Sequence, residues 1–380
     1  MITKDVMTDV NDPVNAAILS VSEDCVQGFD EDPFGTISKR SGVELPVVLE
    51  RIKAMLQAGV IRRVRQTLLA TNLANGALVA WQIDNSRLDE AFDFMSHSDP
   101  FSGHVVIRTA DPASPGAQFR LWTTLKVPQG FSIENHCDFL LEKVGALSYK
   151  IMPARYLFVL GVGHMRRKNL PIGSMADVPA EALDTRIVEL SEEDWKVLIP
   201  LKRELEADEV SQDLWKMRAI EAGLPLERFI SVARTLNQRG VVGRFSTFLE
   251  HVKPNEMGER NVTRYNALFH WAVPAGMEMQ AGQEIGRFHI MTHAYWREGG
   301  EEFRNVNIMG VAHGMDKAVL LAHKEAMDAH LRTLQIPVSY TNVFWGGRSE
   351  IKPSEISPIA YMQFCETHCI HPGDARRSYS

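Results

Sequence analysis

The stretch Asn266-Ala267-Leu268-Phe269-His270-Trp271 decides the fold, because it matches the earlier stretch Gly76-Ala77-Leu78-Val79-Ala80-Trp81. Both are β-prone runs that end in tryptophan. An H-x-x-x-R pair follows each run, at His104 and Arg108 in one copy and at His293 and Arg297 in the other. Matching positions along the chain stay in one order, with offsets that drift only from 181 to 191 residues. Such internal similarity indicates a duplication.

A second repeated element precedes each of these runs. Gly59-Val60-Ile61-Arg62-Arg63 corresponds to Gly240-Val241-Val242-Gly243-Arg244. Apolar residues at helical spacing predict an amphipathic helix before each, over residues 45–58 and 226–239. Shorter helical patterns lie before those helices. Short helices that lead into a Gly-Val-Ile strand are typical of a winged helix-turn-helix.

The segment after each wing reads as strand, helix, strand, strand, helix, strand, which is the ferredoxin-like order. In the second copy we expect strands over 267–273, 287–295, 306–312 and 339–345, and a long helix over 316–334. The first helix of that copy is poorly marked. The sequence therefore predicts an α+β fold in which a winged helix-turn-helix and a ferredoxin-like domain occur twice in tandem and form a pseudo-dimer.

These patterns divide the chain into six expected segments. They are a winged-helix-like domain (1–70), a ferredoxin-like domain (71–165), a linker (166–188), a second winged-helix-like domain (189–260), a second ferredoxin-like domain with the expected active site (261–360), and a tail (361–380).

Composition narrows the class of protein. Apolar residues make up 45% and charged residues 23% of the chain, as in an ordinary globular protein. The N-terminus lacks the apolar region of a secretion signal, no apolar run approaches bilayer length, and four cysteines make no disulfide framework. We therefore expect a cytoplasmic protein without a membrane partner. The net charge of −7 counts against DNA as the main partner.

A helix-turn-helix followed by a ferredoxin-like unit resembles the Lrp/AsnC family. Three stretches of the second copy are similar to the motifs of a narrower family. They are Trp271 after its Asn-Ala strand, Thr292–Arg297 (Thr-His-Ala-Tyr-Trp-Arg) and Asn307–Gly314 (Asn-Ile-Met-Gly-Val-Ala-His-Gly). These stretches resemble the siroheme decarboxylases, which are Lrp/AsnC-like proteins that have become enzymes. The resemblance covers nearly the whole chain and implies a fused form that carries both family subunits.

The resemblance implies a carboxy-lyase that removes acetate carboxyls of siroheme as CO2 and yields didecarboxysiroheme for heme or heme d1 biosynthesis. It also implies His293 and His313 as the functional histidines. The macrocycle must accept electrons as CO2 leaves, and the remaining methylene must be protonated. Imidazole suits both proton transfers because its pKa lies near neutrality. The iron tetrapyrrole is the substrate, and no further cofactor is expected.

Other side chains in the second copy could hold this substrate. Arginine binds carboxylates through two parallel hydrogen bonds, and aromatic rings can stack on a macrocycle. The candidate substrate-binding residues are Arg244, Arg264, His270, Tyr295, Trp296, Arg297, Arg304 and Arg348.

The first copy offers counterparts for part of this set. His104 and Arg108 match the H-x-x-x-R pair, whereas aligning Phe119-Arg120 with Phe303-Arg304 places Gln129 opposite His313. Glutamine cannot act as a general acid near neutral pH. The first copy is therefore expected to have lost catalysis and to serve as a partner or lid.

Two alternative functions stay open at this stage. One is an Lrp/AsnC-type DNA-binding regulator, although the two expected recognition helices carry few basic residues: Arg51 and Lys53 beside Glu50, and Arg228 and Arg234 beside Glu227. The other is a protein that binds heme or another tetrapyrrole without chemistry.

The tail contains four soft metal ligands within seven residues: Cys365, His368, Cys369 and His371. Tetrahedral zinc sites usually bring together ligand pairs separated by a longer loop. A zinc site here is therefore a weak hypothesis, and a surface-packed tail is its alternative.

Overall fold

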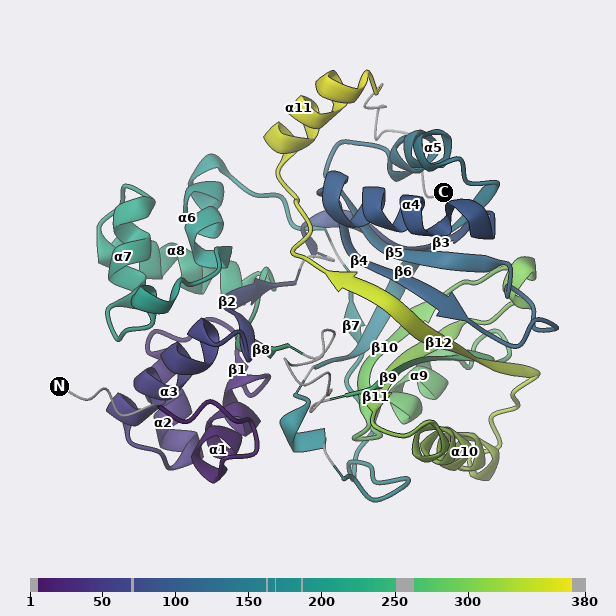
Figure 1. Ribbon diagram of the computed structural model, residues 1–380, viewed down its shortest axis with the longest axis horizontal. Coiled ribbons are helices and arrows are strands. Elements are labelled where there is room, and N and C mark those ends of the chain that lie inside the picture. Colours follow the sequence, from purple (N-terminus) through teal and green to yellow (C-terminus); the bar gives the residue numbers. More distant parts are fainter. Residues whose placement is uncertain are drawn as a thin grey trace. The chain divides into compact units, whose positions relative to one another are not determined.

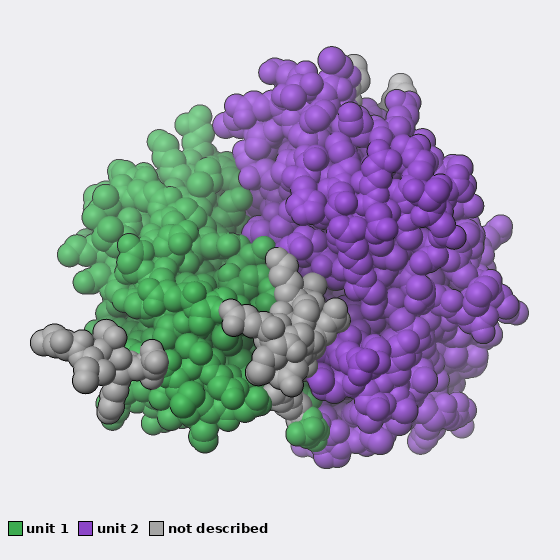
Figure 2. All heavy atoms as spheres, in the orientation of Figure 1, with its two compact units in different colours: residues 1–69, 161–169, 188–262 green, residues 70–160, 170–187, 263–380 purple. Residues whose placement is uncertain are grey.

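The computed structural model describes residues 6–69, 72–161, 163–167, 169–185, 187–250 and 263–370. The chain divides into two compact units (Figure 2), one made of residues 1–69, 161–169 and 188–262 and the other of residues 70–160, 170–187 and 263–380. Each unit thus contains segments from both halves of the chain. Among the described residues, no helix has the length and apolarity needed to cross a membrane.

The first unit combines two sets of three helices with a small sheet. Aspartates cap the first two helices, and a proline follows each cap (Asp12-Pro13 and Asp32-Pro33). The sheet order β1–β8–β2 places a strand from the second half between two strands from the first half. Its elements are α1 (Pro13–Ser22), β1 (Val26–Gln27), α2 (Pro33–Ser41), α3 (Leu45–Gln57), β2 (Ile61–Leu68), η4 (Met165–Arg167), α6 (Glu192–Lys202), η5 (Ala207–Glu209), α7 (Leu214–Glu221), α8 (Leu226–Gln238) and β8 (Val242–Leu249).

The second unit contains two α/β repeats with the same order of main elements (Figure 1). The first comprises β3 (Ala74–Gln82), η2 (Asn85–Arg87), α4 (Leu88–Asp93), η3 (Phe94–Ser98), β4 (Ser102–Thr109), β5 (Phe119–Pro128), α5 (Ile133–Val144) and β6 (Ser148–Leu160). The second comprises β9 (Tyr265–Ala272), α9 (Glu278–Gly286), β10 (Met291–Arg297), η6 (Glu301–Phe303), β11 (Ile308–Gly314), α10 (Lys317–Thr333) and β12 (Tyr340–Ile351). Two further elements are β7 (Leu183–Asp184) and α11 (Pro358–His368).

The strands of the two repeats close into one ring. The order is β10–β11–β9–β12–β4–β5–β3–β6, and β6 also pairs with β10. The long last strand of each repeat makes this closure: β12 pairs first with β9 and then with β4, while β6 pairs first with β3 and then with β10. Every pairing is antiparallel, and each repeat completes the edges of the other.

Among the described residues of the second unit, alternation along the strands separates three apolar cores. One lies between the first repeat and its helices and includes Trp81, Leu140 and Tyr361 of α11. A second lies under the helices of the second repeat and includes Trp271 and Met327. The third draws residues from both repeats, among them Trp122, Met309 and Phe344. We identify this third core with the inward face of the ring, and the site described below lies on the same strand faces.

The expected second-repeat strand 287–295 starts too early. In the structure β10 begins at Met291, because α9 continues to Gly286 and Arg287 caps it. The Arg287 side chain is held there by the carbonyl oxygen of Ala176 and by Glu284. The poorly marked helix is therefore a regular element, although two glycines lie within it.

Candidate functional site

The two candidate histidines lie on the neighbouring strands β10 and β11. The pairing of these strands is irregular between Met291 and His293, which leaves Thr292 at a β-bulge. The Thr292 hydroxyl oxygen lies 3.1 Å from Nδ1 of His293, 3.2 Å from Nδ1 of His313, and 3.0 Å from the carbonyl oxygen of Val311. One hydroxyl thus links both imidazoles, and the structure brings the two candidates together.

The first repeat contributes to the same group of side chains. Asn266 on β9 places its amide nitrogen 2.9 Å from Nε2 of His313. Its amide oxygen accepts a hydrogen bond of 3.0 Å from Arg108 on β4. Arg108 is only 4% exposed, and burial lowers its pKa to about 9. A continuous hydrogen-bonded path therefore runs from Arg108 in one repeat to His293 in the other.

Tyr295 and Arg297 extend the site along β10. Because side chains alternate across a strand, both share a face with His293. The Tyr295 and His293 rings are stacked at 6.1 Å, and the Arg297 guanidinium lies 4.4 Å from the Tyr295 ring centre. Arg297 donates a 2.6 Å hydrogen bond to the carbonyl oxygen of Met152, and burial lowers its pKa.

Positive charge gathers on this inner face. Burial and the nearby Arg297 lower the pKa of Lys126 on β5 to about 8. Arg108, Lys126 and Arg297 form no ion pair with any carboxylate among the described residues. Uncompensated buried cations are costly unless an anion reaches them, so this face suits a ligand with carboxylates.

His270 has a different environment from the histidine pair. It is 1% exposed and lies among Trp122, Phe303 and Phe344. Burial, with a smaller effect from Arg108, lowers its pKa to about 3. No described group is within hydrogen-bond distance of its Nε2. His270 is thus a neutral core residue in this structure, and it does not reach the histidine pair.

The candidates Trp296, Arg348 and Arg304 lie away from the histidine pair. Trp296 faces the opposite side of β10, where it stacks on Tyr156 and donates to Glu298. Arg348 follows Gly346 at an irregularity of β12 and pairs with Asp89 and Asp93 of α4, on the helix-covered face.

Arg304 lies in the turn that joins β10 to β11, beside the Tyr340 ring at 5.2 Å. Tyr340 pairs with Ala272, at the other end of β9 from Asn266. Six residues of strand separate these ends, which corresponds to about 20 Å. Arg304 and the histidine pair therefore do not form one site.

The two remaining arginines differ in position. Arg264 is exposed at the start of β9, and its backbone nitrogen donates to the carbonyl oxygen of Gly314, next to His313. Its side chain is thus attached at the same end of the ring as the histidine pair. Arg244 lies on β8 of the other unit, 6% exposed, with its side chain near the carbonyl oxygen of Glu23.

The strand registers replace Gln129 as the counterpart of His313. Asn266 pairs with His313, and its equivalent Gly76 pairs with Lys126. His293 pairs with Val311, and its equivalent His104 pairs with Thr124, which gives the same alignment. Lys126 therefore corresponds to His313. Gln129 lies beyond the end of β5 and donates to the carbonyl oxygen of Leu73, while His104 lies 2.8 Å from the Ser349 hydroxyl.

The tail residues show no metal site in the described part of the chain. Cys365 is buried against the first-repeat core, the His368 ring packs at a tilt against Phe364 and Phe139, and Cys369 is the exposed cap of α11. His371 lies outside the described residues.

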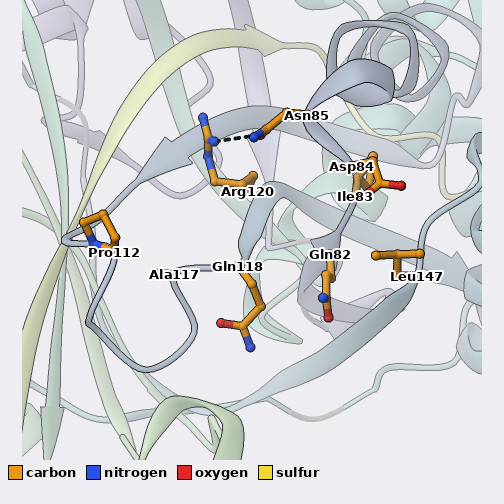
Figure 3. Close-up of a pocket in the computed structure, with 9 residues that line it drawn as sticks. All are labelled: Gln82, Ile83, Asp84, Asn85, Pro112, Ala117, Gln118, Arg120 and Leu147. Carbon is orange, nitrogen blue, oxygen red and sulfur yellow. Dashed lines mark hydrogen bonds between the residues drawn. The ribbon is translucent and has the colours of Figure 1, made fainter.

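A pocket of about 410 Å³ lies in the first repeat, and neither histidine of the pair lines it. Figure 3 shows the residues that line this pocket. Arg120 lines it and donates a 3.0 Å hydrogen bond to Asn85. Its other lining residues are Gln82, Ile83, Asp84, Pro112, Ala117, Gln118 and Leu147. None of them belongs to the path from Arg108 to His293.

Sequence reasoning overlooked three residues of the site: Asn266, Thr292 and Lys126. Asn266 could have been found from strand alternation, since it shares a face with Leu268 and His270. The role of Thr292 depends on a bulge that the sequence does not mark. Lys126 requires the correct strand register.

Comparison with known proteins agrees with this architecture. Residues 73–158 match the model of the AsnC-like ligand binding domain. A siroheme decarboxylase from Hydrogenobacter thermophilus is 26% identical over 293 residues, covering 75% of this chain and 78% of that protein. The crystal structure of the siroheme decarboxylase NirDL matches with a TM-score of 0.64 at 18% identity, over 94% of this chain and 98% of that one.

A second NirDL structure, a co-complex with an iron-uroporphyrin III analogue, matches with a TM-score of 0.62 at 19% identity, over 93% of this chain and 98% of that one. At these identities the structural matches establish the fold, and the sequence match over three quarters of the chain establishes the relationship. The chain is a homologue of the siroheme decarboxylases and contains an AsnC-like ligand-binding domain.

Proposed function

We propose that this protein is a siroheme decarboxylase that removes acetate carboxyls as CO2, and that His293 and His313 form its reacting centre. The observation that carries the proposal is the shared Thr292 hydroxyl, which holds two imidazoles together beside a buried cationic face. These two histidines lie in a chain that is 26% identical to a protein named siroheme decarboxylase.

The chemistry requires one proton for each carboxyl lost. The bond between the acetate methylene and its carboxylate breaks, CO2 leaves, and the electron pair passes into the macrocycle, which protonation makes a better electron sink. The methylene carbon then gains a proton while the macrocycle releases its own, and the methylene becomes a methyl group. An imidazole that can exchange a proton near neutral pH supplies this step.

Charge on the inner face supports the substrate class. Arg297 presents a guanidinium group in a buried position, and Arg264 adds an exposed one at the same end as His313. Guanidinium groups bind carboxylates in two-pronged fashion, which fits a macrocycle with many acidic side chains. Tyr295 adds an aromatic surface beside His293.

We further propose that the two α/β repeats form a pseudo-dimer of ferredoxin-like domains and that the first unit pairs two winged-helix-like domains. The reciprocal pairing of β12 with β4 and of β6 with β10 supports the first part. The repeated helices and the shared three-stranded sheet support the second.

Ion pairs within the first unit weigh against a DNA-binding role. Arg51 of α3 pairs with Asp12, and Arg228 and Arg234 of α8 pair with Glu193 and Glu31. Phosphate contacts by these side chains would require those pairs to break. The homology and the histidine pair favour the enzyme.

The test is anaerobic incubation of the purified protein with siroheme, followed by mass spectrometry of the tetrapyrrole. We expect products that lack one and then two carboxyl groups. Siroheme that binds but stays unchanged would instead indicate a tetrapyrrole-binding protein, and salt-sensitive binding to DNA fragments without turnover would indicate a regulator.

A further inference from the structure

His313 has a polar partner at each ring nitrogen, and the partner at Nδ1 defines a proton position. The Thr292 hydroxyl has one hydrogen, which it donates to the carbonyl oxygen of Val311 at 3.0 Å. Its oxygen can then only accept from His313 at 3.2 Å and from His293 at 3.1 Å. Both imidazoles therefore carry a hydrogen on Nδ1.

The partner at Nε2 leads independently to the same tautomer. Arginine has donors and no acceptor, so the Asn266 atom that faces Arg108 must be the amide oxygen. The amide nitrogen is then the atom 2.9 Å from Nε2 of His313. It donates, and Nε2 accepts. His313 is thus neutral, with its hydrogen on Nδ1.

Protonation of His313 would disrupt this path. A hydrogen on Nε2 would face the hydrogens of the Asn266 amide. Rotation of that amide would relieve the conflict at His313 but would turn its hydrogens toward the buried Arg108 guanidinium. Either arrangement leaves two donors opposed, and the loss of one such hydrogen bond disfavours a state by about tenfold.

His293 differs in this respect. Its Nδ1 donates to Thr292 whether the ring is neutral or protonated. Its Nε2 is not part of the path from Thr292 to Arg108, so a change of protonation at that atom leaves every hydrogen bond of the path in place.

We propose that His293 is the catalytic proton donor, and that Arg108 and Asn266 are positioning residues that keep His313 neutral. This division of roles rests on the proposed function. It assigns to the first repeat a specific part in the reaction, because Arg108 fixes the tautomer of a histidine in the second repeat.

The first repeat lacks this path. The equivalents of Asn266, Thr292 and His313 there are Gly76, Gly103 and Lys126. The same strands and the same irregularity occur, since His104 follows a bulge as His293 does. The path is therefore a feature of the second repeat and not of the strand arrangement that the two repeats share.

Nitrogen NMR of the ligand-free protein with ¹⁵N-labelled histidine tests the proposal without any turnover. The His313 signals are assigned from a His313→Gln sample. Near neutral pH we expect the neutral Nδ1–H tautomer for His313. In Asn266→Asp the carboxylate accepts from Arg108 and from Nε2, so we expect His313 to carry hydrogens on both nitrogens. A protonated His313 or an Nε2–H tautomer in the unmodified protein would overturn the proposal.

Steady-state kinetics with siroheme then separates the roles. We expect His293→Gln to lower kcat at least a hundredfold. Arg108→Met should lower kcat about tenfold, with KM less affected, and Arg108→Lys should recover part of the loss. Near-normal kcat in His293→Gln, with loss only in His313→Gln, would reverse the assignment. If His313 shows the expected tautomer but the unmodified protein does not turn over siroheme, the proposed function is refuted.

Discussion

Replacement of Thr292 by valine tests the link between the two histidines. Valine keeps the branched shape and the strand preference of threonine, so the change removes little except the hydroxyl. That hydroxyl makes three contacts, to His293, His313 and the carbonyl oxygen of Val311. Thr292 itself is 1% exposed, whereas both imidazoles are half-buried.

The magnitude follows from these contacts. A buried donor left without its partner costs about 1–3 kcal/mol, but half-buried rings can turn toward water and recover part of that. We expect the free energy of unfolding to fall by about 1–2 kcal/mol in Thr292→Val. Lost orientation of both rings should lower kcat/KM between about tenfold and a hundredfold, or about 1.4–2.8 kcal/mol of transition-state stabilisation.

Urea denaturation and single-turnover kinetics with siroheme measure the two effects. Thr292→Ser is the matched control, because it retains the hydroxyl and should stay within about threefold of the unmodified protein. If Thr292→Val had the same free energy of unfolding as the serine variant and a kcat/KM within twofold of it, the shared hydroxyl would have no role in holding the histidines.

Three further predictions concern groups outside this link. His270 has a pKa of about 3 in the folded protein and an ordinary value of 6.5 when unfolded. Below pH 6.5 the unfolded state therefore binds an additional proton, and the free energy of unfolding decreases as the pH is lowered. His270→Phe should remove about 1.6 kcal/mol of the loss in unfolding free energy between pH 6.5 and 5. Asp99 and His136 form a fully buried pair at 3.3 Å; burial raises the pKa of Asp99, but His136 more than offsets this, so the folded value is lowered. The stabilisation that accompanies this lowered pKa is present above the ordinary value of 3.8 and is lost as pH falls below it, so Asp99→Asn should lower the free energy of unfolding by about 1–3 kcal/mol at pH 6, and by less in acid. Arg348 is half-exposed and bound to two aspartates on the helix-covered face, so Arg348→Ala should leave kcat/KM within about threefold and cost less than about 1 kcal/mol.

Each of these predictions has a clear opposing result. Equal acid sensitivity of His270→Phe and the unmodified protein in urea titrations would show that another group controls the effect. A constant difference between Asp99→Asn and the unmodified protein from pH 6 to pH 3 would argue against the buried ion pair. A tenfold or greater loss of kcat/KM in Arg348→Ala would place that guanidinium in contact with substrate.

The α+β character of the fold was predictable because both repeats carry the same signals. Two similar β-prone runs ending in Trp81 and Trp271, each followed by an H-x-x-x-R pair, mark equivalent strands. The closure into one ring was not predictable in this way. It depends on the second halves of β6 and β12, whose partners lie far away in sequence.

The candidate site shows the limits of spacing arguments. His293 and His313 were identified from motif resemblance, and the structure places them together. Gln129 was wrong as the counterpart of His313, because Phe119-Arg120 and Phe303-Arg304 are similar in sequence but not equivalent in strand register. Strand pairing, which long-range hydrogen bonds determine, overrides the distance along the chain.

The orientation of single residues was predictable in one case and not in another. Tyr295 and Trp296 are neighbours on a strand, so only one of them could face the same side as His293. Arg348 lies at an irregularity of β12, where simple alternation fails. No local pattern indicates that its side chain turns toward α4.

The reciprocal pairing of β6 and β12 with the opposite repeat has a consequence for how this protein can diversify. In a symmetric pair of identical chains, a change from histidine to lysine on one side would appear on the other as well. Fusion of the halves removes that constraint, so Lys126 and His313 can differ although their strands hold equivalent places in the ring. One gene product then guarantees that each reacting half meets its matching, non-identical neighbour in a one-to-one ratio, without any need for assembly between separate chains.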